Sequence, residues 1–183
     1  AGPCRVIDTR DQSDPIGTLS ALVTRTVNTS GSACGGGLSG DRAAVRNMTV
    51  VPGDPLSYLT VYPAGQSRPE VSTLNSLDAR IKANLAIVPV QNGIDRVNVF
   101  ATNRTEVIAD LSGYFAIPQN APNGLAFYPV TPCRVVDTRN PIGPLGGPAF
   151  TRAQTRTFPV QSSTCGIPST ARAYSFNATV VPS

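Results

Sequence analysis

The segment Ala44-Val-Arg-Asn-Met-Thr-Val-Val51 has the length and the alternating pattern of a β-strand, and turn residues follow it. Short pieces around Val6 and Val71 add to a set of similar segments, so we expect about seven or eight strands. The other clear segments are Leu22–Asn28, Ser57–Tyr62, Ala83–Val90, Arg96–Phe100 and Glu106–Phe115. Strands at this spacing, without helices between them, are typical of antiparallel sandwiches and barrels. We therefore predict an all-β fold, an antiparallel β-sandwich or barrel-like module with almost no helix.

Parts of this module occur twice. Asn47–Pro52 is similar in sequence to Asn177–Pro182. Likewise, Pro-Cys-Arg-Val-Ile-Asp-Thr-Arg at residues 3–10 is similar to Pro-Cys-Arg-Val-Val-Asp-Thr-Arg at 132–139. The offset is about 130 residues, far above the roughly 20–50 residues of a solenoid or propeller repeat. Each copy is therefore expected to be a folded module of its own.

The second copy is incomplete in this sequence, because the stretch from about 53 to 115 occurs once. We predict a complete module over residues 1–116, a linker over 117–124 rich in Pro, Gly and Asn, and a partial second repeat over 125–183 that holds the first half only. Strands are expected in the partial repeat over 125–130, 156–160 and 171–181. A half-module leaves an apolar edge or face uncovered. We expect another chain to cover it, unless the sequence is cut from a longer array.

Four cysteines fall at equivalent places in the two copies: Cys4 with Cys34, and Cys133 with Cys165. Only this pairing repeats the same local bridge twice, so two disulfides within the copies are the leading interpretation. Four buried free thiols are the alternative, and a zinc site lacks the Cys-x-x-Cys spacing and the histidines that it needs. Disulfides indicate an oxidising compartment and hence a secreted, extracellular or cell-surface protein.

Composition excludes several classes of function. The 15 basic residues are scattered singly, whereas nucleic-acid binding needs clustered charge, so we predict no nucleic-acid partner. No apolar run approaches the roughly 18 residues of a membrane span. Histidine is absent, which removes the Ser-His-Asp and Cys-His arrangements, and the 11 acidic residues form no catalytic signature. We predict no enzymatic activity, no cofactor and no metal.

The repeated motif brings charged residues together. Strict alternation places Arg5, Ile7 and Thr9 on one strand face and Val6, Asp8 and Arg10 on the other. Ion pairs or turn caps are expected within each motif, from Arg5, Asp8 and Arg10 in the first copy and from Arg134, Asp137 and Arg139 in the second. Contact with an anion, a sugar or calcium is the alternative; for calcium, Asp8 would act with Asp11 and Asp14, although the spacing of a calcium loop is missing.

The last segment of the second copy differs from its counterpart. Tyr174 and Phe176 stand where the first copy has Ala44 and Arg46, so one strand face becomes aromatic. Drift between repeats would explain this change. The sharper interpretation is a different packing partner, and we predict an assembly interface formed by Tyr174, Phe176 and Val180.

These motifs resemble a PCRVVDTR-type tandem repeat module found in secreted and surface proteins of bacteria. The resemblance rests on residues 132–143, 165–168 and 177–181, and on 58–63, 84–89 and 110–115 of the first copy. The first copy departs from it at Cys34-Gly-Gly-Gly37, where the second has Cys165-Gly-Ile-Pro168. The resemblance implies an extracellular all-β module and no established catalytic residue.

The expected function is that of a secreted structural module whose copies assemble head to tail into a fibre or surface array by strand or half-module complementation. The alternative is a carbohydrate-binding or adhesive module with glycan partners. The candidate surface on which a sugar would stack consists of Tyr58, Tyr62, Tyr114 and Tyr128. The absence of tryptophan weakens this alternative.

Overall fold

The computed structural model describes residues 3–11, 13–14, 16–29, 34, 41–90, 96–117, 119, 123–128, 131, 133–176 and 178–180. The chain divides into two compact units, Ala1–Asn123 and Gly124–Ser183, called here the first unit and the second unit. This division falls at the end of the segment that the sequence marks as a linker.

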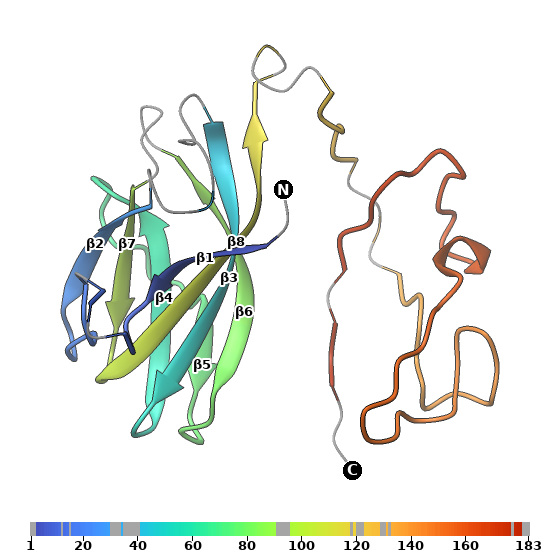
Figure 1. The fold of residues 1–183 in the computed structure, drawn as a ribbon, viewed down its shortest axis with the longest axis horizontal. Coiled ribbons are helices and arrows are strands. Elements are labelled where there is room, and N and C mark those ends of the chain that lie inside the picture. The colour runs from blue at the N-terminus through green and yellow to red at the C-terminus, as the bar shows by residue number, and fades with distance from the viewer. Residues whose placement is uncertain are drawn as a thin grey trace. The chain divides into compact units, whose positions relative to one another are not determined.

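The first unit is a sandwich of two antiparallel sheets (Figure 1). The first sheet has the strand order β1-β8-β3-β6, and the second has the order β2-β7-β4-β5. Within the described residues its strands are β1 (Cys4–Asp8), β2 (Thr24–Asn28), β3 (Asp41–Pro52), β4 (Leu56–Pro63), β5 (Leu74–Ser76), β6 (Lys82–Pro89), β7 (Arg96–Ala101) and β8 (Thr105–Ala116). For the first unit the predicted all-β sandwich is confirmed, and its two separate sheets exclude the barrel-like variant.

The core lies between the two sheets. On β3 the alternate residues Ala44, Arg46, Met48 and Val50 are all fully buried, because they form the inner face of the first sheet. Of these, Met48 and Val50 belong to one hydrophobic cluster with side chains of the second sheet such as Leu56, Leu59, Val97 and Val99. Burying this surface supplies most of the driving force for folding at roughly 25 cal/mol per Å² of apolar area.

Strand β3 is an inner strand with neighbours on both sides. It pairs with β8 along Asp41–Pro52 and with β6 along Ala43–Val50. Strand β8 in turn lies between β3 and β1, since Cys4, Arg5, Ile7 and Asp8 pair with β8 residues from Leu111 to Ile108. Strand β6 ends the sheet, and within the described residues no strand pairs with its other edge.

The second unit contains no β-strand among its described residues. The segments that the sequence predicts as strands, 125–130, 156–160 and 171–181, are extended or irregular where they are described, and the one helical turn is the 3₁₀ helix η2 (Val160–Ser162). The physical reason is the lack of neighbours: β3 is held by β6 and β8, and the sequence has no second copy of either strand. A lone strand leaves its backbone hydrogen-bonding groups to water.

One arginine organises a loop of the second unit. Arg156 donates from Nη2 to the carbonyl oxygens of Gly146 and Gly147, at 2.9 and 3.2 Å, and from Nη1 to the carbonyl oxygen of Pro148. Its guanidinium also lies 4.8 Å from the ring centre of Phe158 and 5.4 Å from that of Phe150. A planar cation that donates at its edge and stacks through its face holds this loop together without a sheet.

Candidate functional site

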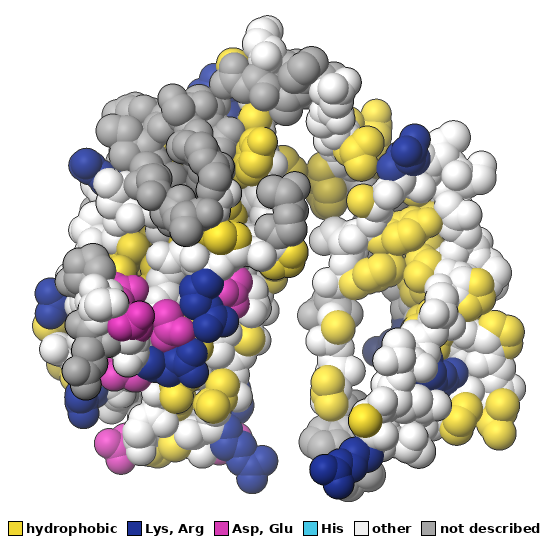
Figure 2. Space-filling model, in the orientation of Figure 1, with side chains coloured by type: hydrophobic (Ala, Val, Ile, Leu, Met, Phe, Trp, Pro, Cys, Tyr) yellow, Lys and Arg dark blue, Asp and Glu magenta, His cyan; other side chains and the backbone are white. Residues whose placement is uncertain are grey.

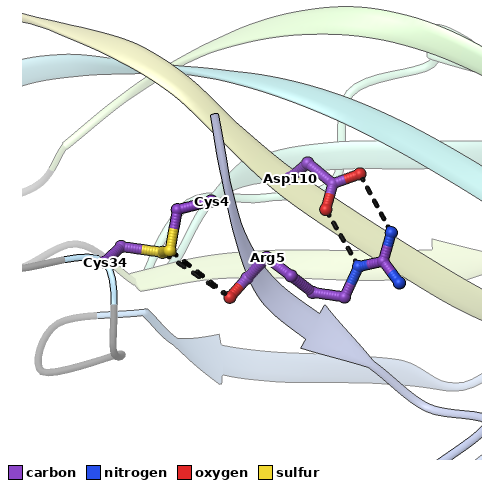
Figure 3. Close-up of a disulfide and its surroundings, with 4 residues drawn as sticks. All are labelled: Cys4, Arg5, Cys34 and Asp110. Atoms are coloured by element: carbon purple, nitrogen blue, oxygen red, sulfur yellow. Dashed lines mark hydrogen bonds and ion pairs between the residues drawn. A yellow bond between two sulfur atoms is a disulfide. The ribbon is translucent and has the colours of Figure 1, made fainter. Parts of the chain in front are cut away.

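Both predicted disulfides are present. Cys4 is bonded to Cys34 and Cys133 to Cys165, with Cα–Cα distances of 5.4 and 5.7 Å. The first bridge ties the start of β1 to Cys34, which follows β2 (Figure 3). The pairing within each copy agrees with an oxidising environment.

The first copy of the motif forms a compact ion-pair cluster around Asp8. Arg5 Nη1 lies 3.0 Å from Asp8 Oδ2, and Arg10 Nη2 lies 2.7 Å from the same oxygen. Arg10 Nε donates to Asp8 Oδ1 at 2.8 Å, so its contact is bidentate. The hydrogen bonds from Arg10, opposed in part by desolvation, lower the pKa of Asp8 from 3.8 to about 2.

Strict alternation along β1 is wrong for Arg5. The register between β1 and β8 shifts between Arg5 and Ile7, so Val6 is an extra residue in the strand. A bulge of this kind resets the alternation, and Arg5 therefore lies with Asp8 and Arg10 rather than with the buried Ile7. Figure 2 shows acidic and basic side chains gathered on one face of the first unit.

Strand β8 supplies two acidic contacts to the motif that the sequence analysis missed. Arg5 Nε donates to Asp110 Oδ1 at 2.9 Å, and Arg5 Nη2 lies 3.5 Å from Asp110 Oδ2 (Figure 3). The hydrogen bond to Asp110 raises the pKa of Arg5. At the other end of the motif, the hydroxyl of Thr9 donates to Glu106, which also accepts from Thr18. No local pattern in the sequence predicts these contacts, because they join residues about a hundred positions apart.

The second copy reproduces the local geometry of the motif. Arg134 Nη1 lies 3.0 Å from Asp137 Oδ2, and Arg139 Nη2 lies 2.7 Å from the same oxygen. Arg139 Nε donates to Asp137 Oδ1 at 2.9 Å. These hydrogen bonds, with Arg139 as the main donor, hold the pKa of Asp137 well below its ordinary value. The ion-pair cluster thus forms from the motif alone.

The contact to a second carboxylate is where the two copies differ. Arg5 uses Nη1 for Asp8 and the pair Nε and Nη2 for Asp110. Arg134 uses Nη1 for Asp137, and among the described residues its Nε and Nη2 meet no carboxylate. Its side chain is 71% exposed, against 49% for Arg5.

The predicted assembly residues align in sequence with core residues of the first unit, but they are themselves exposed. In the alignment of the copies, Tyr174, Phe176 and Val180 correspond to Ala44, Arg46 and Val50 on the inner face of β3. Those three are 0% exposed in the first unit, whereas Tyr174, Phe176 and Val180 are 40%, 54% and 85% exposed. The rings of Tyr174 and Phe176 lie 5.7 Å apart. Figure 2 shows hydrophobic side chains on the visible surface of the second unit.

Asp11 and Asp14, which were considered as calcium ligands, accept hydrogen bonds from nearby backbone N–H groups. Asp14 accepts the N–H groups of Asp8 and Ile16, at 3.0 and 2.9 Å. Asp11 accepts from the backbone and hydroxyl of Ser13, and these bonds lower its pKa. Among the described residues no group of three or more Asp, Glu, Cys or His side chains is placed to hold a metal ion.

The four tyrosines of the sugar-binding alternative have different surroundings. Tyr62 is buried on β4, and Tyr58 of the same strand packs against Phe100 with ring centres 5.8 Å apart. Tyr114 is exposed on β8 of the other sheet, and Tyr128 is exposed in the second unit. Glycan binding gains no support from these positions.

Comparison of the chain with family models, with curated proteins and with solved structures finds no match. Among the described helical segments, none has the length and apolar character of a membrane span.

Proposed function

We propose that this chain is a secreted, non-enzymatic structural module whose copies join head to tail through the second unit. The observation that carries the proposal is the exposure of Tyr174, Phe176 and Val180, whose counterparts in the first unit are fully buried. Large apolar and aromatic side chains that are exposed at a surface are typical of protein–protein interfaces. The two disulfides support function in an oxidising extracellular setting.

A head-to-tail contact that leaves the first unit folded is the addition of a strand at a free sheet edge. The free edge of β6 offers such a contact. This strand ends the first sheet, and its residues Leu85 and Ile87 are 48% and 54% exposed although both are large and apolar. Segment 171–180 of a neighbouring copy, added to β6 as a further strand, would bring Tyr174 and Phe176 beside Leu85 and Ile87. Cross-strand aromatic–aliphatic pairs each contribute roughly 0.2–1 kcal/mol, and the backbone ladder adds hydrogen bonds.

The contact is heterologous, since the second unit of one chain meets the first unit of the next. Heterologous contacts that do not close into a ring produce filaments. One feature of β6 hinders pairing with an arbitrary strand: Asn84 Oδ1 already accepts the N–H of Leu85 at 3.0 Å. Strand addition would have to displace this side chain, which favours a specific partner over a chance one.

The test pairs two charge substitutions with a matched control. Phe176→Asp in the second unit and Ile87→Lys on β6 are each expected to abolish filaments seen by negative-stain electron microscopy. Ile142→Asp is the control, because Ile142 is an equally apolar residue of the second unit, 85% exposed and outside the proposed contact. Filaments that survive both substitutions, or that are lost equally in the control, contradict the proposal.

A further inference from the structure

The first unit contains two peptide bonds of the acid-sensitive Asp-Pro type, one after Asp14 and one after Asp54. In such a bond the aspartate carboxylate can attack the backbone carbonyl carbon of its own residue and close a five-membered ring. The proline nitrogen has no hydrogen and leaves as a secondary amine. Because attack within one residue is strongly favoured when the carboxylate is free to reach the carbonyl carbon, the surroundings of each carboxylate decide which bond breaks.

The carboxylate of Asp14 is not free to react in the folded chain. Its Oδ2 accepts the N–H of Asp8 at 3.0 Å, and its Oδ1 accepts the N–H of Ile16 at 2.9 Å. The backbone carbonyl oxygen of Asp14 accepts the N–H of Gly17 at 3.2 Å. Hydrogen bonds to both carboxylate oxygens fix the group and make it a weaker nucleophile. We therefore expect folding to protect the bond between Asp14 and Pro15.

Asp54 has different surroundings. It lies in the turn between the end of β3 at Pro52 and the start of β4 at Leu56, and Gly53, Asp54 and Pro55 are all exposed. Among the residues that the structure describes, no hydrogen-bond donor or charged side chain contacts the Asp54 carboxylate. A methyl group placed on Gly53 would meet nothing within 4 Å, so the turn is open on this side as well. The Asp54 carboxylate is therefore free to reach its own carbonyl carbon.

We propose that the folded chain cleaves itself in mild acid at the bond between Asp54 and Pro55. A carboxylate oxygen of Asp54 bonds to the backbone carbonyl carbon of Asp54, the bond from this carbon to the Pro55 nitrogen breaks, and the nitrogen takes a proton from the solvent. Water then opens the cyclic anhydride, which restores the side-chain carboxyl and leaves an α-carboxyl on Asp54. The net reaction is the hydrolysis of one peptide bond.

The fold is arranged to hold the two products together. Strands β1, β2 and β3 precede the cleaved bond, and each of them pairs with a strand that follows it: β1 with β8, β2 with β7, and β3 with both β6 and β8. Neither disulfide crosses the cleaved bond, since Cys4 is bonded to Cys34 and Cys133 to Cys165. Cleavage therefore converts the first unit into two halves that stay paired without a covalent link and can be exchanged between copies.

Mass spectrometry of the intact, disulfide-bonded chain tests the cleavage. The chain is incubated with protease inhibitors at about pH 4, where the stability contributed by Asp8 is complete, and circular dichroism verifies that it stays folded. We expect fragments 1–54 and 55–183 to form together, at least about tenfold faster than cleavage after Asp14. In guanidinium at the same pH the two bonds should break at similar rates, because the hydrogen bonds to Asp14 are lost. The fragments should coelute in gel filtration and separate in denaturant without a reductant.

Variants with a matched control show whether the carboxylate is the nucleophile. Asp54→Asn is expected to abolish the cleavage, and Asp54→Glu to slow it at least about tenfold, because its charge is kept but the ring that must close is larger. Ser57→Ala, at an exposed position of β4 beside the turn, should cleave like the native chain. Absence of fragment 1–54, equal cleavage after Asp14 in the folded chain, or cleavage that persists in Asp54→Asn would overturn the inference.

Discussion

Arg5 on β1 forms an ion pair with Asp110 on β8, with Nε 2.9 Å from Oδ1. The same guanidinium forms a second ion pair with Asp8, with Nη1 3.0 Å from Oδ2. One side chain thus joins a local motif to a strand about a hundred residues away. The second copy of the motif keeps the local ion pair, and among the described residues no second carboxylate contacts its Arg134.

Asp110→Asn is expected to destabilise the first unit modestly. The pair is partly exposed, with side chains 49% and 24% accessible, so the loss should be about 0.5–1 kcal/mol. Urea unfolding followed by tyrosine fluorescence measures it. Asp54→Asn, an exposed acidic residue of the β3–β4 turn, is the control and should unfold like the native chain. A loss no larger than in the control would show that the ion pair contributes nothing.

Acid is expected to weaken the fold through Asp8. The pKa of its carboxyl is about 2 in the folded chain and 3.8 ordinarily, so the unfolded chain binds its proton first as the pH falls. The stability from Asp8 is therefore complete above pH 3.8 and declines as the pH falls toward 2. Carboxyl carbon chemical shifts in an NMR titration report the pKa directly.

Arg10→Gln provides the matched variant for this titration, because Arg10 is the main donor to Asp8. The substitution should move the pKa of Asp8 back toward 3.8 and flatten the acid dependence that this residue contributes. An unchanged Asp8 titration in the variant would exclude Arg10 as the cause.

The disulfide of the first unit is expected to contribute about 3–4 kcal/mol to its stability, since it closes a loop between residues 30 positions apart. The double substitution Cys4→Ser with Cys34→Ser tests this by the shift in the urea midpoint. The corresponding pair at Cys133 and Cys165 is the comparison and should leave the unfolding of the first unit unchanged. A shift of equal size from both pairs would contradict the independence of the two bridges.

Gly147→Ala is expected to open the loop of the second unit that Arg156 holds. A methyl group at this position would lie 2.8 Å from the carbonyl oxygen of Asn140, which accepts the Gly147 N–H, so the backbone must move apart. Faster hydrogen exchange of the Gly147 amide measures the opening. Gly53→Ala serves as the control, because a methyl group there meets nothing within 4 Å. Unchanged exchange would show that the loop absorbs the methyl group without opening.

The sequence allowed the sandwich, the strand segments of the first unit and both disulfides to be predicted, because alternation and repeated cysteine spacing are local signals. The alternating pattern gave the wrong strand face for Arg5, because a bulge at Val6 changes the face on which Arg5 lies. Nothing in the five residues of β1 predicts this bulge. The contacts of Glu106 and Asp110 with the motif were not predicted, because they depend on the pairing of β1 with β8, which lies about a hundred residues further along the sequence. The strands predicted for the second unit do not form among its described residues, because a strand needs neighbours, which a local pattern cannot supply.

Sedimentation velocity of the full, disulfide-bonded chain over a wide concentration range shows whether copies of the chain join head to tail. We expect species that grow in size with concentration, and a return to the monomer when Phe176 is replaced by Asp. A chain that stays monomeric at the highest concentration, with Tyr174, Phe176 and Val180 exposed in solution, would contradict it.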